Sequence, residues 1–183
     1  MADLFRLDGK IAVVIGGAGG LGESVALGIA RQGAKVVVAS RNISRCKEVA
    51  LNISTDPAVT SETAVFQVDV TDEDNVAQLV ARITAEVGVP DILINAQGIN
   101  IKKASTEFPM MDWDRMFDVN VKGTMITCKE FGKVMIEKNA GKIINFSSVR
   151  GIRGTAGGNT GYGATKGAVD MITRMLAAEW APN

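Results

Sequence analysis

The chain has 183 residues, of which 46% are hydrophobic and 22% are charged, and its formal net charge is zero. This composition predicts a single globular domain over residues 1–183, and the balanced charge argues against nucleic acid as a partner. No apolar run is long enough to cross a bilayer, and the N-terminus lacks the layout of a signal peptide, so we expect a cytoplasmic protein that binds no membrane. The chain has no histidine and two widely spaced cysteines, so we expect no metal site and no disulfide.

Apolar strands and amphipathic helices alternate along the chain. Strands are expected at residues 11–15, 34–40, 63–70, 91–98 and 141–148, and helices at 21–33, 43–53, 71–88, roughly 111–137, and around Tyr162. Asn42 or Ser44 can cap the second helix, and Thr71 with Asp74 resembles a capping box for the third. Continuous apolar strands alternating with helices predict an α/β fold, with a parallel sheet covered by helices on both faces.

A glycine-rich segment, "GGAGGLG" at residues 16–22, follows the first strand and opens the first helix. At such a turn, main-chain N–H groups and the helix N-terminus can hold a pyrophosphate, and glycine leaves room for its approach. Two registers fit the segment. Gly17, Gly19 and Gly22 satisfy G-x-G-x-x-G, whereas Gly16, Gly20 and Gly22 satisfy G-x-x-x-G-x-G, and the sequence does not choose between them.

The second strand ends in "VVVASRN", where a site that selects NAD usually carries an acidic residue. Ser40 and Arg41 stand there instead, and a hydroxyl beside a guanidinium suits a 2'-phosphate. These residues favour NADP(H) as the cofactor and leave NAD(H) possible.

Tyr162, the only tyrosine, lies four residues before Lys166 in a predicted helix. Residues at this spacing face the same way on a helix, so the two side chains would lie side by side. An adjacent ammonium favours the ionised form of a phenol, which makes proton transfer easier near neutral pH.

Six separated motifs together resemble the short-chain dehydrogenase/reductase family along nearly the whole chain. They are "GGAGGLG", "DV" at Asp69 and Val70, "NAQG" at residues 95–98, "NVKG" from Asn120, "SS" at residues 147–148, and "YGATK" from Tyr162. The resemblance implies a Rossmann-type doubly wound parallel sheet in three α/β/α layers, and an oxidoreductase that moves a hydride between a nicotinamide and a secondary alcohol or ketone.

The resemblance implies a catalytic group of Asn120, Ser148, Tyr162 and Lys166. Tyr162 would exchange a proton with the substrate oxygen, and Lys166 would assist it and hold the nicotinamide ribose. Ser148, preferred over Ser147, would donate a hydrogen bond to the carbonyl oxygen, and Asn120 would support Lys166 through a water. The implied cofactor contacts are Gly16, Gly19, Gly20, Leu21, Gly22, Ser40, Arg41, Asp69, Val70, Asn95, Ala96, Gly98, Tyr162 and Lys166.

The chain departs from the family pattern at several places. "NAQG" stands where "NNAG" is commoner, and Gly19 occupies a position where many NADP-dependent members carry a basic residue, which tempers the cofactor preference. Family members continue beyond "MLAAEWAPN" into sheet strands 6 and 7, so we expect a C-terminally incomplete sheet in the order 3-2-1-4-5. An alternative function for such a truncated form is a catalytically impaired subunit that binds a nucleotide.

The substrate and the oligomeric state are also inferred from resemblance. "VVVASRN" and "AAEWAP" resemble members that act on sugar acids and polyols, particularly gluconate 5-dehydrogenases, while related members reduce 3-oxoacyl thioesters. The long helix and the Tyr162 helix resemble those that pair across the family dimer, so a homodimer or homotetramer is expected.

Overall fold

The computed structural model describes residues 4–182 of the chain. Its sheet has five parallel strands in the order β3-β2-β1-β4-β5, which confirms the predicted topology. The strands are β1 (Ile11–Ile15), β2 (Lys35–Ser40), β3 (Thr63–Gln67), β4 (Ile92–Asn95) and β5 (Lys142–Asn145). Because all strands run in one direction, their carboxyl ends meet at a single edge of the sheet, where the connecting loops can build a site.

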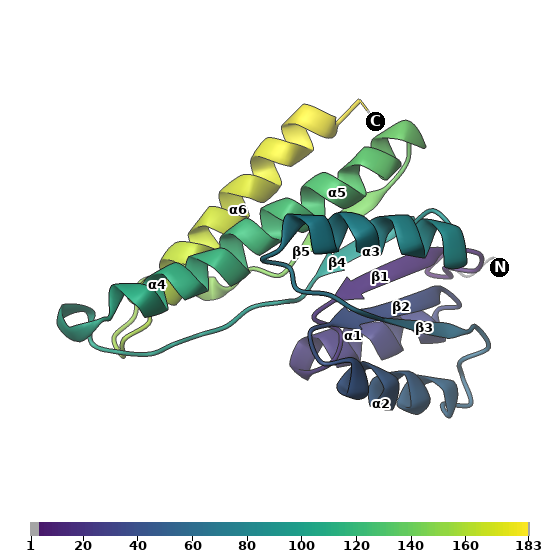
Figure 1. Cartoon of the computed structure of the whole chain (residues 1–183), viewed down its shortest axis with the longest axis horizontal. Coiled ribbons are helices and arrows are strands. Elements are labelled where there is room, and N and C mark those ends of the chain that lie inside the picture. Colours follow the sequence, from purple (N-terminus) through teal and green to yellow (C-terminus); the bar gives the residue numbers. More distant parts are fainter. Residues whose placement is uncertain (1–3, 183) are drawn as a thin grey trace.

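Helices cover both faces of the sheet, in the three layers that the sequence predicts (Figure 1). One face carries α1 (Gly20–Arg31) and α2 (Ile43–Ser54), and the other carries α3 (Glu73–Glu86), α5 (Gly123–Glu137) and α6 (Thr160–Trp180). A shorter helix, α4 (Met110–Phe117), precedes α5 and extends away from the sheet. Within residues 4–182, no helix is long and apolar enough to cross a membrane.

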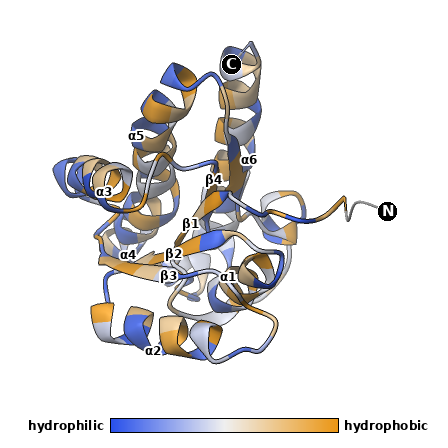
Figure 2. Ribbon diagram, turned by 90° about the vertical axis from the view of Figure 1, so that its right-hand side faces the viewer, coloured by the Kyte–Doolittle hydropathy of each residue, from blue (hydrophilic) through white to orange (hydrophobic). Residues whose placement is uncertain are grey.

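The core forms because successive strand residues point to opposite faces. Val13 and Ile15 of β1 pack among buried residues of α3 and α5, whereas Val14 packs against α1 and α2. Figure 2 shows the same arrangement as hydrophobic strands between helices whose outer faces are more hydrophilic. Two apolar layers therefore hold the strands in place, and the polar site residues are left at the carboxyl edge.

The starts of two helices test the predicted caps. Asn42 caps α2, because its side chain accepts a hydrogen bond from the Arg45 N–H at 3.0 Å. The capping box predicted at Thr71 was wrong. The cap of α3 is Asp72, which accepts from the Asn75 N–H, and the Thr71 hydroxyl donates instead to Asp69.

The helix expected over residues 111–137 is confirmed as one continuous helical segment, Met110–Glu137, but its middle turn is not α-helical. It consists of α4 and α5 joined by a π-helical turn over Asp118–Lys122, in which the Gly123 N–H donates to the Asp118 carbonyl. A π turn inserts one extra residue into a helix and is frequent at functional sites. This turn carries Asn120, so it lies where the resemblance implies a functional residue.

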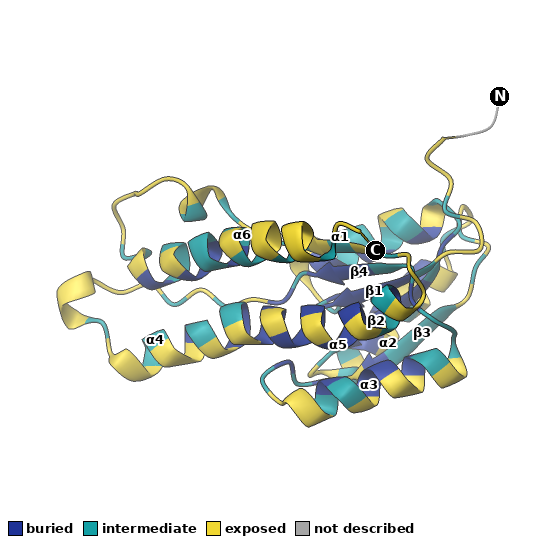
Figure 3. Ribbon diagram, turned by 90° about the horizontal axis from the view of Figure 1, so that it is seen from above, coloured by how far each residue is buried: buried dark blue, intermediate teal, exposed yellow. Residues whose placement is uncertain are grey.

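The two edges of the sheet differ in cover. On β5, Ile144 is 49% exposed, and along the second half of α6 Met171 and Met175 are exposed as well (Figure 3). On β3, the opposite edge strand, Phe66 is only 3% exposed. The β5 side is therefore the less covered part of the domain.

Candidate active site

The turn between β1 and α1 brings two parts of the main chain too close together for side chains. Gly16 has a φ of +77°, and a Cβ atom there would lie 2.6 Å from the Gln97 nitrogen. A Cβ atom at Gly22 would lie 2.3 Å from the Gly16 carbonyl oxygen. Glycine at both positions therefore keeps the turn tight, with the N-terminus of α1 at the carboxyl edge of the sheet.

The same geometry favours one of the two glycine registers. Gly20 also has a positive φ, of +52°, so Gly16, Gly20 and Gly22 each meet a conformational or steric need for glycine. Gly19 has an extended backbone, and a Cβ atom there would meet nothing within 4 Å. The open space at Gly19 belongs to a cavity that could admit a phosphate group.

That cavity, of about 300 Å³, lies at the carboxyl edge of the sheet. It brings together eight residues that the sequence predicts as cofactor contacts: Gly16, Gly19, Ser40, Arg41, Asp69, Val70, Ala96 and Gly98. It is also lined by Ile15, Val68, Gln97, Ile99 and Val119, which sequence reasoning did not single out. Of these five, only Gln97 brings a polar side chain, and the one signal for it in the sequence is the unusual "NAQG".

Six other predicted cofactor residues do not line this cavity. They are Gly20, Leu21, Gly22, Asn95, Tyr162 and Lys166. The Leu21 side chain is exposed to solvent, and Gly22 packs beneath the loop against Gly16. The Asn95 side chain is buried and donates to Asn145 Oδ1 at 2.8 Å and to Cys128 Sγ at 3.4 Å, so it joins β4 to its neighbours.

Charged and polar groups from β2 and β3 form one end of the cavity. The Asp69 carboxylate accepts hydrogen bonds from the Thr71 N–H and hydroxyl. The pKa of Asp69 is lowered, chiefly by the hydrogen bond from the Thr71 N–H. The Thr71 hydroxyl and the nearby Arg41 charge lower it further, whereas burial acts in the opposite direction. The Ser40 hydroxyl accepts from the Asn42 N–H at 3.1 Å and lies 3.2 Å from Cys46 Sγ. Arg41 is therefore the residue of the Ser40–Arg41 pair that presents charge to this end.

Asn120 is fully buried in the π turn and connects three segments. Its Oδ1 accepts from the Ile99 N–H at 2.8 Å, and its Nδ2 donates to the Ile99 carbonyl at 2.9 Å and to Thr165 Oγ1 at 3.0 Å. The loop after β4, the π turn and α6 thus meet at one side chain. Asn120 is thus a buried residue that joins these segments.

Lys166 and Tyr162 lie side by side on α6, as their spacing predicts. The Lys166 ammonium lies 5.7 Å from the centroid of the Tyr162 ring and donates to the Phe146 carbonyl at 2.6 Å. Lys166 is buried, which lowers its pKa, and the Asp170 charge opposes that shift. A Cβ atom at Gly98 would lie 3.7 Å from Lys166 Nζ, so the ammonium lies beside the cofactor cavity.

Ser148 begins a short 3₁₀ turn, Val149–Gly151, that packs on α6. Its Oγ accepts from the Arg150 N–H at 3.2 Å, whereas the Ser147 hydroxyl donates to the Lys166 carbonyl at 3.4 Å. A Cβ atom at Gly163 would lie 3.0 Å from the Arg150 carbonyl oxygen, so glycine permits this close approach. The structure therefore places the Ser148 turn directly against the helix of Tyr162 and Lys166.

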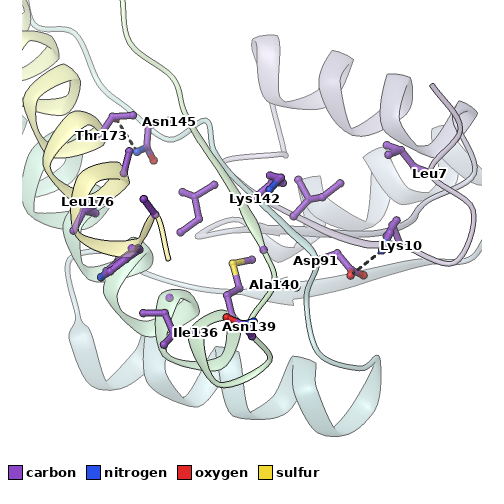
Figure 4. Close-up of a pocket in the computed structure, with 18 residues that line it drawn as sticks. Leu7, Lys10, Asp91, Ile136, Asn139, Ala140, Lys142, Asn145, Thr173 and Leu176 are labelled. Carbon is purple, nitrogen blue, oxygen red and sulfur yellow. Dashed lines mark hydrogen bonds and ion pairs between the residues drawn. The ribbon is translucent and has the colours of Figure 1, made fainter. Parts of the chain in front are cut away.

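A larger cavity, of about 680 Å³, lies elsewhere, beside β5 and the second half of α6 (Figure 4). Leu176, Ile136 and Ala140 line its apolar part, and the hydrogen bond from Asn145 to Thr173 closes one side. None of the predicted catalytic residues lines either cavity, but Gly98, beside the Lys166 ammonium, lines the smaller one. The smaller cavity, which contains the glycine loop and adjoins Lys166, is therefore the candidate active site.

Comparison with known proteins identifies the family of the chain. A sequence profile of the short chain dehydrogenase family matches residues 10–183, nearly the entire chain. The chain belongs to the short-chain dehydrogenase/reductase family. It is therefore an oxidoreductase that acts on CH–OH groups with a nicotinamide cofactor.

Individual family members show how far the similarity extends. An uncharacterised oxidoreductase of Staphylococcus saprophyticus is 39% identical over 178 residues, which are 97% of this chain and 75% of the relative. A short-chain type dehydrogenase/reductase from Mycobacterium marinum superimposes with a TM-score of 0.94 at 32% identity, covering 98% of this chain and 72% of the other. A gluconate 5-dehydrogenase from Burkholderia cenocepacia, in complex with NADP and tartrate, superimposes with a TM-score of 0.89 at 34% identity, covering 97% and 68%.

Proposed function

We propose that this short-chain dehydrogenase/reductase uses NADP(H) to interconvert a secondary alcohol and a ketone, with Tyr162 carrying the proton. The observation that carries the proposal is the position of Lys166. Its buried ammonium lies next to the Tyr162 ring on one side and Gly98, at the cofactor cavity, on the other. The Lys166 ammonium would therefore contact both the proton carrier, Tyr162, and the bound nicotinamide nucleotide.

The residues of the chain divide the chemistry among them. The bound nicotinamide would supply or accept the hydride. The Tyr162 hydroxyl gives a proton to the substrate oxygen during reduction and takes it back during oxidation. The Lys166 ammonium stabilises the phenolate that forms when the proton leaves, and burial strengthens this interaction because less water screens it.

Ser148 is the proposed donor to the substrate oxygen. Its hydroxyl accepts a hydrogen bond from the Arg150 N–H, which leaves its own proton free to be donated where negative charge develops. The Ser147 hydroxyl already donates to the Lys166 carbonyl. This difference supports Ser148 over Ser147.

The preference for NADP(H) rests on Arg41. Its guanidinium borders the cavity end that would receive the adenine ribose, and guanidinium groups bind phosphate in two-bond geometry. Two features oppose it: Gly19 brings no second positive charge, and the Asp69 carboxylate lies close enough to interact with Arg41. NAD(H) is the alternative cofactor.

For the substrate we propose a sugar acid or a polyol. The similarity to the gluconate 5-dehydrogenase supports this choice, together with the sequences "VVVASRN" and "AAEWAP". The alternative is a 3-oxoacyl thioester, which would present the same carbonyl group to Tyr162 and Ser148.

We also propose that copies of the chain associate through α5 and α6, as a dimer or tetramer. Met171 and Met175 on α6 and Met125 on α5 are exposed, and contact with a second copy would remove them from water. Light scattering on the purified chain tests this proposal, and a monomeric mass would contradict it.

The function is tested by binding and turnover on the same preparation. NADPH and NADH are titrated by the fluorescence of the reduced nicotinamide, and NADP⁺ and NAD⁺ reduction is then followed with polyols and sugar acids. The reverse reaction is run with 3-oxoacyl thioesters. We expect tighter NADPH binding and turnover of at least one alcohol. Binding without any turnover would favour a nucleotide-binding subunit, and no binding of either cofactor would contradict the proposal.

A further inference from the structure

Gln97 is a buried polar residue that the proposed chemistry does not use. It is 9% exposed, lies on the loop after β4, and lines the cofactor cavity. Its main-chain nitrogen packs against Gly16 so closely that no side chain fits at that glycine. Gln97 therefore lies directly between the glycine loop and the helices behind it.

The Gln97 side chain points toward the helix that follows the π turn. Its Nε2 lies 3.2 Å from Thr124 Oγ1, and that hydroxyl lies 2.8 Å from the Asn120 carbonyl oxygen. A threonine hydroxyl has a single proton, and a carbonyl can only accept. Thr124 therefore donates to Asn120 and accepts from Gln97, which fixes the direction of both hydrogen bonds.

Within the part of the chain that the structure describes, the carbonyl oxygen of the Gln97 side chain makes no hydrogen bond to compensate for its burial. Gln97 Oε1 is buried and has no hydrogen-bond partner among residues 4–182. Burying an unpaired carbonyl oxygen is unfavourable. The side chain is thus held in place despite this cost, and its contribution is the N–H that it donates to Thr124.

Thr124 donates its hydrogen bond to Asn120, the residue that joins three segments. The Asn120 carbonyl accepts from Thr124, while the Asn120 side chain binds the Ile99 main chain and Thr165. Thr165 immediately precedes Lys166 on α6. The hydrogen bond from Gln97 to Thr124 and the one from Thr124 to Asn120 therefore connect the loop at the cofactor cavity with the π turn, and Asn120 connects that turn with the segment of Lys166.

We propose that Gln97 is a positioning residue for the reaction, acting through Thr124 to fix the π turn and the orientation of Asn120. This inference rests on the proposed function for its effect on turnover. Its structural part, the fixing of residues 118–124, is measured without substrate or cofactor and so stands or falls separately.

Two variants that remove the interaction with little change in volume provide the first test. In Gln97→Met and in Thr124→Val the hydrogen bond between the two side chains is lost. We expect kcat to fall about tenfold in each, which corresponds to roughly one hydrogen bond, while KM for the cofactor changes less than about twofold. The kcat of the double variant should be no lower than that of the more impaired single variant, because both changes break the same hydrogen bond. Unchanged kcat in both single variants would overturn the proposal.

Amide hydrogen exchange supplies the readout that is independent of activity. In the protein without cofactor, residues 118–124 should exchange faster in Gln97→Met and Thr124→Val than in wild type, with Thr124→Ser restoring protection because it keeps the hydroxyl. Wild-type exchange in both variants would contradict the structural part. If these changes appear while wild type shows no turnover, the proposed function fails and the positioning by Gln97 does not.

The variant Gln97→Glu gives a signature that loss of packing cannot produce. A protonated carboxyl group can donate to Thr124 as the amide does, whereas an ionised one can only accept and would draw the Thr124 proton away from Asn120. We expect kcat to be nearest to wild type at low pH and to fall as pH rises through the pKa of the introduced carboxyl. Arg41, Asp69 and Lys166 are the charged groups around the same cavity, and they are present in both proteins, so the pH profile of Gln97→Glu is read as a ratio to that of wild type. A constant ratio would contradict the proposal.

Thr127→Val is the matched control. Thr127 is also buried on α5, and its hydroxyl donates to the Gly123 and Thr124 carbonyls without contacting Gln97. The Thr127→Val variant should lose about as much unfolding free energy as Thr124→Val, with kcat unchanged. A fall in kcat equal to that of Thr124→Val would show a general effect of loosening α5 and would overturn the specific role of Gln97.

Discussion

The glycine loop and the cluster around Lys166 meet at the same cavity but are built from different interactions. At Gly16 and Gly22 the main chain alone sets the geometry, through a positive φ and through contacts too close for a Cβ atom. The Lys166 cluster depends on hydrogen bonds that side chains donate, from Asn120 to the Ile99 carbonyl and Thr165 and from Lys166 to the Phe146 carbonyl. The loop is therefore a rigid feature of the backbone, whereas the cluster can be changed one side chain at a time.

This difference predicts that cofactor binding and proton transfer respond to separate mutations. A change that fills the cavity at the glycine loop should weaken binding, and a change in the Lys166 cluster should lower turnover with less effect on binding. Any mutation that reverses this division would show that the two regions act as one unit.

The largest effect is expected for Lys166→Met. Without the ammonium the phenolate of Tyr162 is not stabilised, so turnover should fall by about 10²-fold or more, the usual contribution of general acid–base catalysis. Lys102→Met, which removes an exposed lysine from a loop, is the control and should leave turnover unchanged. The measurement is the steady-state rate of cofactor reduction, and a fall of less than about threefold would contradict the assigned role.

The same variant has a predicted effect on stability that depends on pH. Burial lowers the pKa of Lys166, so the folded state binds its proton less readily than the unfolded state does. This unfavourable effect is fully present below the folded pKa and disappears as pH rises past the unfolded value. The unfolding free energy of Lys166→Met, relative to wild type, should thus be highest near neutral pH and decline in alkaline solution. Denaturant titrations across this range would show the trend, and a difference that grows with pH would contradict it.

The next effect is expected for Gly19→Val. A Cβ atom at Gly19 meets nothing within 4 Å, so the fold should be retained, but the added side chain would occupy the space proposed for the pyrophosphate. We expect the Kd for NADPH to rise at least about tenfold, with an unfolding midpoint close to wild type. Gly28→Ala, an exposed position of α1 with equal room, should bind normally and gain about 1 kcal/mol of stability. Normal NADPH binding by Gly19→Val would place the pyrophosphate elsewhere.

A smaller effect is expected for Arg41→Gln, which tests cofactor choice. Loss of a charged hydrogen bond to the 2'-phosphate should weaken NADPH binding by about tenfold and leave NADH binding nearly unchanged. Lys47→Gln removes a positive charge from the exposed face of α2 and serves as the control. Equal weakening of both cofactors by Arg41→Gln would indicate that the arginine does not read the phosphate.

The smallest effect concerns Cys128, a buried residue of α5 that contacts Asn95 and Asn145 and belongs to neither region. Burial raises its pKa to about 11, against hydrogen bonds with Asn145 and Asn95, so its thiol should stay protonated and unreactive at neutral pH. A thiol reagent should label Cys128 only after unfolding, as mass spectrometry of the labelled peptide would show. Rapid labelling of the native protein would mean that this part of α5 opens readily.

The sequence predicted the arrangement of the elements because hydrophobic periodicity reports directly on burial. It did not predict the π turn, because low helix propensity in residues 118–122 does not distinguish an extra residue in a turn from an ordinary helix, and the contacts of Asn120 with Ile99 and Thr165 come from distant segments. Asp72 replaced Thr71 as the cap of α3 because Thr71 is bound to Asp69, a contact that spacing does not reveal.

The candidate site shows the same limits. Motifs singled out Tyr162, Lys166 and the glycine loop together with Leu21 and Asn95, but they did not indicate that the Leu21 side chain is exposed or that the Asn95 side chain binds Asn145. They omitted Gln97, because its importance lies in a hydrogen bond to a helix that begins 26 residues later. Neither the direction of a side chain nor its distant partners can be read from a local pattern.

The central claim, that Tyr162 carries the proton at a separately built nicotinamide site, is tested most directly by measuring Tyr162→Phe and wild type side by side for both NADPH affinity and turnover. We predict that Tyr162→Phe binds NADPH within about twofold of wild type and loses turnover by about 10²-fold or more. Turnover near the wild-type rate in Tyr162→Phe would contradict the account.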